Sequence, residues 1–267
     1  MSLARTIVIT GASSGIGRAL ALHYAKRDGA AVRLVLLGRD VARLDAVSQD
    51  CRAAGADVRT ARLDVRDRQA MHEGLRAIDR ETPVDLLVAN AGISTGLASG
   101  VLTENPDAVR AITAINWLGT LNTVEPLIEP MISRGRGRIA MTGSIAGVRG
   151  LPYSPAYCAT KAAVHLYADS LRGNLRKKGV GVSLIVPGFV HTPMNADLVA
   201  FQPMAMTDTK AAGIVARGLD AGRAVVAFPK PLYWFARVSS FLPAALADAI
   251  LARFRVDITE TRERVLS

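Results

Sequence analysis

Cysteine is scarce in this chain, and long uninterrupted hydrophobic segments are absent from its sequence. The two cysteines, Cys51 and Cys158, are too few for a disulfide framework, so we expect a reducing compartment, the cytoplasm. The most apolar segment, Val238 to Ala252, is shorter than the ~18 residues that a membrane-spanning helix needs, and it contains Pro243 and Asp248. The first residues, MSLARTIVIT, offer no apolar core long enough for a signal peptide. We therefore expect neither a disulfide-rich secreted domain nor a membrane-spanning protein.

Acidic residues are outnumbered, because the 267 residues include 33 Lys and Arg but 23 Asp and Glu, which gives a net charge of +10. The basic residues are spread along the sequence in short groups, of which Arg134, Arg136 and Arg138 are separated by glycines that predict a turn. A nucleic-acid-binding protein would gather its basic residues on one face of a recognisable module, so we expect no nucleic-acid partner. The positive charge instead favours anionic ligands, such as a phosphorylated cofactor, an acidic substrate or a membrane surface.

Short β-branched runs alternate with amphipathic segments of helical length along the first 228 residues. We expect strands at residues 6–10, 32–37, 58–63, 84–89, 138–142, 180–186 and 224–228, and helices at residues 16–28, 41–54, 68–80, 107–133, 155–178 and 208–221. Strands that are apolar throughout, with helices between them, form a parallel sheet covered on both faces. The sequence therefore predicts a single-domain α/β protein with a doubly wound, Rossmann-like parallel sheet. Its ligands should bind at the carboxyl ends of the strands.

A glycine-rich segment follows the first expected strand, with the sequence Thr10-Gly11-Ala12-Ser13-Ser14-Gly15-Ile16-Gly17. Glycine lets the backbone turn tightly and approach a pyrophosphate, whose charge then faces the free N–H groups of the following helix. An ordinary strand-to-helix turn is the alternative, but the position between a strand and a helix is the one that the nucleotide-binding motif requires. The loop therefore predicts a dinucleotide site, with cofactor contacts from Gly11, Ser13, Ser14, Gly15, Ile16 and Gly17.

Further motifs follow in a fixed order along the chain. Asn90-Ala91-Gly92 comes after the fourth expected strand, Asn116 lies in the long helix, Ser144 follows the fifth strand, and Tyr157 and Lys161 stand four residues apart on the next helix. Together with the G-x3-G-x-G loop, these motifs resemble those of the short-chain dehydrogenase/reductase family in its single-domain form, over residues 4–228. The resemblance implies a nicotinamide cofactor, a small-molecule substrate and hydride transfer between a ketone or aldehyde and an alcohol. We also expect a homo-oligomer, either a dimer or a tetramer.

The chemistry of the Tyr157–Lys161 pair can also be argued from spacing, because residues four apart project from one face of a helix. A tyrosine with a pKa of ~10 is a poor acid or base at neutral pH, and a neighbouring ammonium group lowers that pKa. By resemblance, Tyr157 transfers the proton, Ser144 orients the substrate oxygen, Lys161 also holds the cofactor ribose, and Asn116 supports a proton-relaying water. From the residues alone, a surface Tyr–Lys pair and a helix-packing asparagine stay open as alternatives.

Other catalytic constellations find little support in the sequence. The segment Gly143-Ser144-Ile145-Ala146-Gly147 lacks the spacing of a nucleophile elbow, so hydrolase chemistry is not expected. Cys158 has no histidine or metal partner in the pattern and is interpreted as a packing residue. The four histidines lack ligand-like spacing, so we expect no metal and interpret each as a surface or packed imidazole: His23, His72, His165 and His191.

The residues at the end of the second expected strand indicate whether the cofactor carries a 2′-phosphate, as NADP(H) does, or a free ribose 2′-OH, as NAD(H) does. Gly38 stands where an NAD-preferring site usually has an acidic residue that accepts from the ribose 2′-OH. Arg39 follows, and its planar cation suits a 2′-phosphate. Asp40 is interpreted as the N-cap of the next helix. We therefore expect NADP(H) as the preferred cofactor, with NAD(H) as the alternative.

The resemblance completes the cofactor site with residues from three other loops. It assigns the adenine contact to Asp64 and Val65, although a turn aspartate that caps the next helix is an equally simple interpretation of Asp64. It places the Asn90-Ala91-Gly92 segment against the cofactor. It gives the nicotinamide side to the loop after the sixth strand, which supplies Pro187, Gly188, Val190 and Thr192.

The substrate side of the expected cleft is mostly apolar. The candidates are Ile93, Leu97, Val148, Leu151, Tyr153, Met194, Leu198, Val199, Phe201, Met204 and Met206. They predict a small or lipophilic ketone or alcohol as substrate, while packing of a lid explains the same residues equally well. A sugar reductase, a 3-oxoacyl-thioester reductase and a non-catalytic NADP(H)-sensing or scaffolding protein are the alternatives in function.

Residues 229–267 continue past the expected catalytic domain, residues 1–228, as a C-terminal extension of the same domain. Their aromatic and aliphatic groups are interleaved with arginines, and Pro243 predicts two short helices. We expect this extension to cover the substrate cleft or a partner subunit. Peripheral contact with a membrane is the alternative that the same residue types allow.

Overall fold

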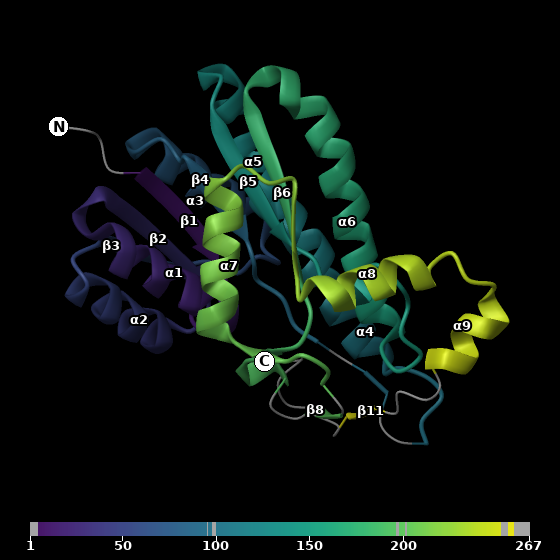
Figure 1. Cartoon of the computed structure of the whole chain (residues 1–267). Coiled ribbons are helices and arrows are strands. Elements are labelled where there is room, and N and C mark those ends of the chain that lie inside the picture. The colour runs from purple at the N-terminus through teal and green to yellow at the C-terminus, as the bar shows by residue number, and fades with distance from the viewer. Residues whose placement is uncertain are drawn as a thin grey trace.

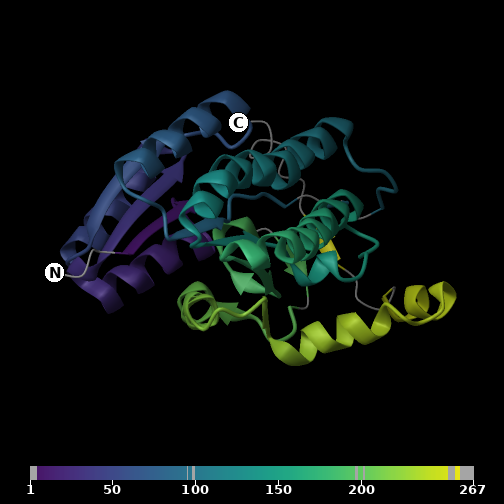
Figure 2. The same cartoon turned by 90° about the horizontal axis from the view of Figure 1, so that it is seen from above.

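The computed structural model describes residues 5–94, 96–97, 100–195, 198–200, 202–251 and 256–258 of the chain. A parallel sheet of seven strands runs through the protein, and helices lie on both of its faces (Figures 1 and 2). In spatial order the strands are β3 (Asp57–Arg62), β2 (Val32–Gly38), β1 (Arg5–Thr10), β4 (Leu86–Ala89), β5 (Gly137–Thr142), β6 (Val180–Pro187) and β10 (Val225–Phe228). The strand order reverses between β1 and β4. This arrangement confirms the predicted doubly wound fold.

Two separate hydrophobic cores lie on the two faces of the sheet. Alternate residues of β1 divide between them, because successive side chains of a strand point to opposite faces. Ile7 and Ile9 pack with one core and Val8 packs with the other. The first core is covered by α1 (Gly15–Asp28), α2 (Val41–Ala53) and α7 (Asp208–Asp220), and the second by α3 (Arg68–Glu81), α5 (Gly119–Arg134) and α6 (Pro155–Leu175).

The ends of the elements lie close to the predicted positions. Asp40 caps α2 as expected, since its side chain accepts a hydrogen bond of 3.0 Å from the Arg43 backbone N–H. The β4 strand begins at Leu86 instead of residue 84. The α6 helix ends at Leu175, and a 3-10 turn follows it where the sequence pattern predicted more α-helix.

The long helix predicted at residues 107–133 is interrupted in the structure. It consists of α4 (Pro106–Ile112), a π-helical segment (Thr113–Leu118) and α5. A hydrophobic period of 3.6 residues cannot distinguish one wide turn from an α-helical turn, so this π-helical segment could not be predicted from the sequence. Such π-helical turns are frequent at functional sites, and Asn116 lies within this one.

The C-terminal extension forms the two predicted helices, α8 (Lys230–Ser239) and α9 (Ala244–Leu251), on either side of Pro243. The α8 helix packs against β10. Beyond them, β11 (Val256–Ile258) pairs antiparallel with β8 (Leu198–Ala200), a contact that the sequence did not predict. A second small sheet pairs β7 (Val190–His191) with β9 (Met206–Thr207). Among the residues that the structure describes, no helix is long and apolar enough to cross a membrane.

Candidate active site

A cavity of about 1190 Å³ opens at the carboxyl ends of the sheet strands. Its lining comes from the loops that follow β1, β2, β3, β4, β5 and β6 and from the first turns of α6. This is the place at which doubly wound sheets bind their ligands. The predicted cofactor residues on its wall are Gly11, Ser13, Ser14, Gly15, Ile16, Arg39, Asp64, Val65, Asn90, Ala91, Gly92, Tyr157, Lys161, Pro187, Gly188, Val190 and Thr192.

The glycine-rich loop owes its shape to the missing side chains. Gly11 and Gly15 have φ angles of +65° and +54°, a left-handed conformation that glycine adopts without strain. A Cβ atom on Gly17 would lie 2.4 Å from the Gly11 carbonyl oxygen, so the start of α1 can approach the loop only without one. Gly17 is not on the cavity wall, and it acts on the loop by this close packing. The Ser14 side chain makes no capping hydrogen bond at the start of α1, whose first N–H groups can therefore face an anion.

Asn90 and Thr10 join the loop after β4 to the end of β1. The Asn90 side-chain amide donates to the Thr10 carbonyl oxygen at 3.1 Å. In return, the Thr10 hydroxyl accepts hydrogen bonds from the backbone N–H groups of Asn90 and Ala91, at 3.0 and 3.2 Å. Thr10 is almost fully buried, and the sequence analysis did not single it out. A threonine at the last position of an apolar strand was the only signal available.

Ser144, Tyr157 and Lys161 meet in the cavity, as the motif spacing predicted. The Ser144 side chain lies close enough to the Tyr157 hydroxyl to lower its pKa through hydrogen bonding. The Lys161 ammonium donates to the Thr142 carbonyl oxygen at 2.9 Å and lies 5.8 Å from the centre of the Tyr157 ring. The Ser144 oxygen also accepts a 3.1 Å hydrogen bond from the Ala146 backbone N–H, which holds the hydroxyl in place.

Burial controls the protonation of this cluster. It raises the pKa of Tyr157, and the hydrogen bond from Ser144 opposes the rise only in part. Burial also lowers the pKa of Lys161 to about 8. From the Tyr-x3-Lys motif we expected the lysine charge to lower the pKa of Tyr157, but the net shift in the free protein has the opposite direction. The reason is that the motif reveals the charge beside the tyrosine but not the loss of water around it.

Asn116 lies behind the cavity and not on its wall. Its side-chain oxygen accepts from the Ile93 backbone N–H and its amide donates to the Ile93 carbonyl oxygen, both at 2.9 Å. A Cβ atom on Gly92 would lie 3.2 Å from the Asn116 oxygen and 3.5 Å from the Lys161 ammonium. Asn116 thus fixes the loop after β4 beside Lys161, and its part in a proton relay stays a prediction.

His165 is a site residue whose role the sequence analysis missed. Its Nε2 atom accepts a hydrogen bond of 3.3 Å from the Ser144 backbone N–H. Burial, followed by the charge of Lys161, lowers the pKa of His165 to about 4, which keeps the ring neutral and able to accept. A Cβ atom on Gly143 would lie 2.3 Å from this nitrogen, so the glycine before Ser144 makes room for the ring.

The end of the cavity beside the loops after β2 and β3 is rich in cations. Four arginines line it: Arg39, Arg43, Arg62 and Arg66. The Asp40 carboxylate is engaged by Arg43, whose Nε lies 3.0 Å away. Burial alone would raise the pKa of Asp64, but the hydrogen bonds and charge of Arg66 outweigh it and hold that pKa below its ordinary value. Of the three aspartates on this part of the wall, Asp40 and Asp64 are held by arginines and Asp67 caps α3. Arg39 is exposed at the edge of the cavity.

The segment from Ile93 to Asn105 and Met194 complete the cavity wall with apolar residues and with Ser94, Thr103, Glu104 and Asn105. Of the predicted substrate residues, Ile93, Leu97 and Met194 line the cavity. Val148 and Leu151 instead line a smaller hollow beside Cys158. Tyr153, Met204 and Met206 do not reach the cavity wall, Phe201 lies outside the described residues, and so do the side chains of Leu198 and Val199. In the described part of the chain, no group of His, Cys, Asp and Glu side chains has the arrangement of a metal site.

The sequence profile of the family described as short chain dehydrogenase matches residues 5–203. An uncharacterized oxidoreductase of Myxococcus xanthus (strain DK1622) is 38% identical over 252 residues, which cover 94% of this chain and 98% of that protein. The 17-beta-hydroxysteroid dehydrogenase type 1 of Homo sapiens is 36% identical over 194 residues, which cover 71% of this chain and 58% of the human protein. The chain therefore spans somewhat more than half the length of this human relative.

Two solved structures share the architecture over nearly the whole chain. A short chain dehydrogenase/reductase from Burkholderia phymatum in complex with NAD has a TM-score of 0.79 at 25% identity, and the match covers 97% of this chain and 98% of that one. A short-chain dehydrogenase from Sphingobium yanoikuyae in complex with NADPH has a TM-score of 0.76 at 24% identity, and the match covers 97% and 99%. The second likeness bears on the fold alone.

Proposed function

Because the chain belongs to the short-chain dehydrogenase/reductase family of oxidoreductases, which use a nicotinamide cofactor, we propose that it interconverts a ketone or aldehyde and an alcohol. One observation carries the proposal: Ser144, Tyr157 and Lys161 share a cavity with the glycine-rich loop. A proton-transferring group therefore lies in the same space as a dinucleotide-binding loop. A non-catalytic sensor of the same fold would have no need to keep all three side chains.

The residues of the cavity fit the proposed cofactor. The Gly11 to Gly17 loop has no room for additional side-chain atoms at Gly11 and Gly17, and it leads into the N-terminus of α1, which suits a pyrophosphate. Asp64 and Val65 suit the adenine, and Lys161 suits a ribose hydroxyl. The nicotinamide side falls to the segment that supplies Pro187, Gly188, Val190 and Thr192. When bound, the cofactor supplies or accepts the hydride.

Tyr157 and Ser144 handle the proton and the oxygen of the substrate. In reduction the Tyr157 hydroxyl gives its proton to the carbonyl oxygen, and in oxidation it takes the proton back. The Ser144 hydroxyl donates a hydrogen bond to the same oxygen as negative charge develops there. The Lys161 ammonium, 5.8 Å from the tyrosine ring, stabilises the phenolate that remains after proton transfer. Asn116 holds the neighbouring loop and supports the delivery of protons to Lys161.

The preference for NADP(H) rests on the end of β2. Gly38 leaves no carboxylate at the position that would accept from a ribose 2′-OH. Asp40 and Asp64 on the cavity wall are paired with Arg43 and Arg66, whose charges offset their repulsion of a second phosphate. Arg39 supplies the cation that a 2′-phosphate requires.

The substrate proposal rests on the apolar wall formed by Ile93, Leu97, Val101 and Met194. Such a wall favours a lipophilic ketone or secondary alcohol, because burial of its apolar surface contributes binding free energy. A relative named as a hydroxysteroid dehydrogenase supports the same class of substrate.

Replacement of Tyr157 by Phe tests the catalytic proposal. We expect a panel of lipophilic ketones to oxidise NADPH with the wild-type protein, measured by absorbance, and we expect turnover to be lost in Tyr157→Phe with NADPH binding retained. Tyr167→Phe on the same helix is the matched control and should keep its activity. Turnover by Tyr157→Phe at the wild-type rate on any ketone would refute the assigned proton donor.

Replacement of Arg39 by Ala tests the cofactor preference separately. A charge-assisted hydrogen bond contributes about 1.5–3 kcal/mol, so the affinity for NADPH should fall by about 10-fold to 100-fold while that for NADH stays nearly constant. Arg18→Ala is the control, because the Arg18 side chain is 44% exposed, pairs with Asp50 and is not on the cavity wall. An equal loss for both cofactors would remove the basis of the NADP(H) preference.

A further inference from the structure

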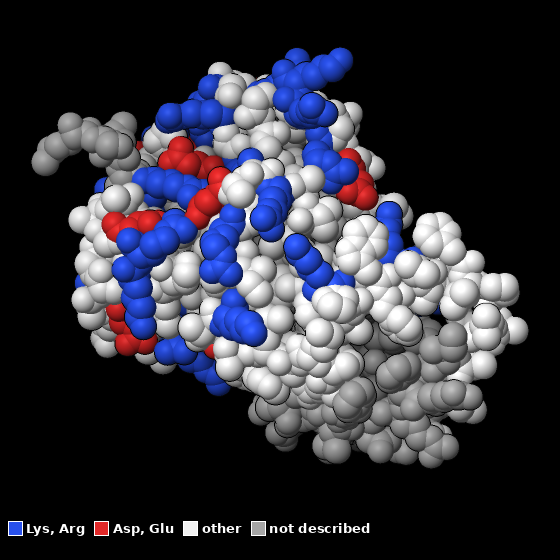
Figure 3. Space-filling model, in the orientation of Figure 1, with Lys and Arg blue, Asp and Glu red and all other residues white. Residues whose placement is uncertain are grey.

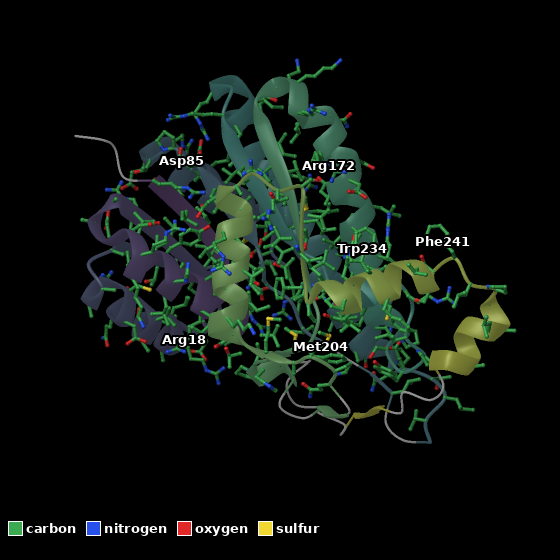
Figure 4. All side chains as sticks on the ribbon, in the orientation of Figure 1. Arg18, Asp85, Arg172, Met204, Trp234 and Phe241 are labelled. Carbon is green, nitrogen blue, oxygen red and sulfur yellow. The ribbon has the colours of Figure 1, made fainter. Side chains whose placement is uncertain are left out.

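The α8 helix has apolar residues on two opposite sides. On the inner side, Tyr233 packs against one of the sheet's hydrophobic cores and Ala236 is buried. On the outer side, Trp234 and Val238 are 60% and 61% exposed, and Phe241, in the turn after the helix, is 83% exposed. We call the outer residues the α8 apolar face: Trp234, Phe235, Val238, Phe241 and Leu246. Figure 4 shows Trp234 and Phe241 along the same outer side of α8.

The positions of these residues around the helix axis explain why some are buried and others exposed. At 100° per residue, Trp234 and Val238 fall within one narrow stripe of α8, which is opposite Ala236. Phe241, in the turn after the helix, lies on the same outer side. A soluble helix normally has polar residues on the side away from the core. The exposed stripe of α8 therefore lacks the polarity of an ordinary solvent-facing surface.

The segment between Asp220 and Asp248, which carries this face, has charged residues of one sign. No Asp or Glu occurs in the sequence between Asp220 and Asp248, whereas Lys230 and Arg237 both lie on α8 and are exposed. The two cations are seven residues apart, about two helical turns, so they follow one edge of the apolar stripe. In Figure 3 the described surface over α8 and α9 is largely white, with blue groups beside it.

A bound substrate and a second copy of the chain are two other candidates for covering the α8 apolar face, and both fit these observations less well. The face does not belong to the substrate cavity, since none of its five residues lines it. In a two-fold contact between copies, the same patch meets itself, so Lys230 and Arg237 would approach the cations of the second copy with no acid from this segment to balance them. An anionic bilayer surface offers both an apolar environment and negative charge. Its acyl chains accept the aromatic groups, and its phosphates attract the basic residues at the edge of the stripe.

We propose that the α8 apolar face is a peripheral docking site for anionic lipid bilayers. Trp234 and Phe241 enter the boundary between headgroups and acyl chains, while Lys230 and Arg237 stay at the level of the phosphates. Binding then requires both the apolar side chains and the negative surface charge. It should weaken as salt increases, because the electrostatic part is screened.

Co-sedimentation with vesicles tests the proposal. We expect the full chain to pellet with vesicles of phosphatidylcholine and phosphatidylglycerol at low salt, to bind pure phosphatidylcholine weakly, and to be released as sodium chloride increases. Trp234→Ser combined with Phe241→Ser should reduce the affinity at least about tenfold, from the lost burial of two aromatic groups. Leu166→Ser is the matched control, because Leu166 is 71% exposed on α6 and is not one of the residues of the α8 apolar face. Circular dichroism checks that each variant is folded.

Tryptophan fluorescence gives a second measurement on the same samples. The emission of the wild-type protein should shift to shorter wavelength with anionic vesicles, and Trp234→Phe should abolish the shift and keep most of the binding. A failure to bind anionic vesicles at low salt would overturn the proposal. So would unchanged binding of the double serine variant, which would assign the affinity to general positive charge. A change of oligomeric state in the double serine variant, without vesicle binding by the wild type, would assign the face to a contact between copies.

Discussion

Gly17 offers a direct test of how the cofactor loop is built, through replacement by alanine. The new Cβ would lie 2.4 Å from the Gly11 carbonyl oxygen and 2.6 Å from the Asn90 side-chain nitrogen. Neither atom can move freely, because one belongs to the backbone of the loop and the other donates to the Thr10 carbonyl. Overpacking of this kind costs about 1–3 kcal/mol. The higher helix propensity of alanine recovers up to about 1 kcal/mol, which is less than most of the range of the overpacking cost. We therefore expect Gly17→Ala to lower the free energy of unfolding by about 1–2 kcal/mol and to weaken NADPH binding.

Gly173 provides the matched control, because it also lies in a helix but has open space around it. No heavy atom lies within 4 Å of the Cβ that alanine would add there. Only the propensity gain remains, so Gly173→Ala should raise the free energy of unfolding by up to about 1 kcal/mol. Urea denaturation of both variants measures the two values, and fluorescence titration measures NADPH affinity. Changes of the same sign, or full NADPH affinity in Gly17→Ala, would refute the packing argument.

Three further predictions concern buried titratable side chains. The pKa of Lys161 is about 8 in the fold against 10.5 in the unfolded chain, so the ammonium destabilises the fold below pH 8 and this cost disappears as the pH rises to 10.5. Lys161→Met should therefore unfold at higher urea at pH 7, lose that advantage near pH 10.5, and have no turnover. The pKa of His165 is about 4 in the fold against 6.5 unfolded, so stability should fall by up to about 3 kcal/mol as the pH drops from 6.5 to 4. His165→Gln should flatten that dependence in urea titrations, and an unchanged slope would contradict it. Asp79 is buried 2.7 Å from Arg134, so Asp79→Asn should lower the melting temperature, in contrast to the exposed Asp169→Asn.

Features encoded in neighbouring residues could be predicted from the sequence. The strands and helices followed from hydrophobic runs and their spacing, and Asp40 followed from its place before a helix. Pro243 was enough to divide the C-terminal extension into α8 and α9. The division of the chain at residue 228 into a catalytic domain and an extension stays a prediction.

Features that depend on distant residues could not be predicted. His165 lies 21 residues from Ser144, and only the packing of α6 against the end of β5 brings its ring to the Ser144 backbone. The pairing of β8 with β11 joins segments more than 50 residues apart, which local patterns cannot reveal. The direction of the Tyr157 pKa shift required the burial of its surroundings, and the Tyr-x3-Lys motif does not contain that information.

Burial sets the protonation state of Tyr157 and of Lys161 in the free protein. Because the pKa of Tyr157 is raised, its hydroxyl keeps its proton in the free protein at neutral pH, and this is the form that protonates a carbonyl. Oxidation of an alcohol needs the phenolate instead, so part of the energy for that direction must come from the Lys161 charge or from alkaline pH. Lys161, with a pKa of about 8, holds its charge at neutral pH and loses it under those alkaline conditions. The same dry environment that strengthens the Ser144 and Tyr157 hydrogen bonds thus limits the pH range in which Tyr157 can act as a base.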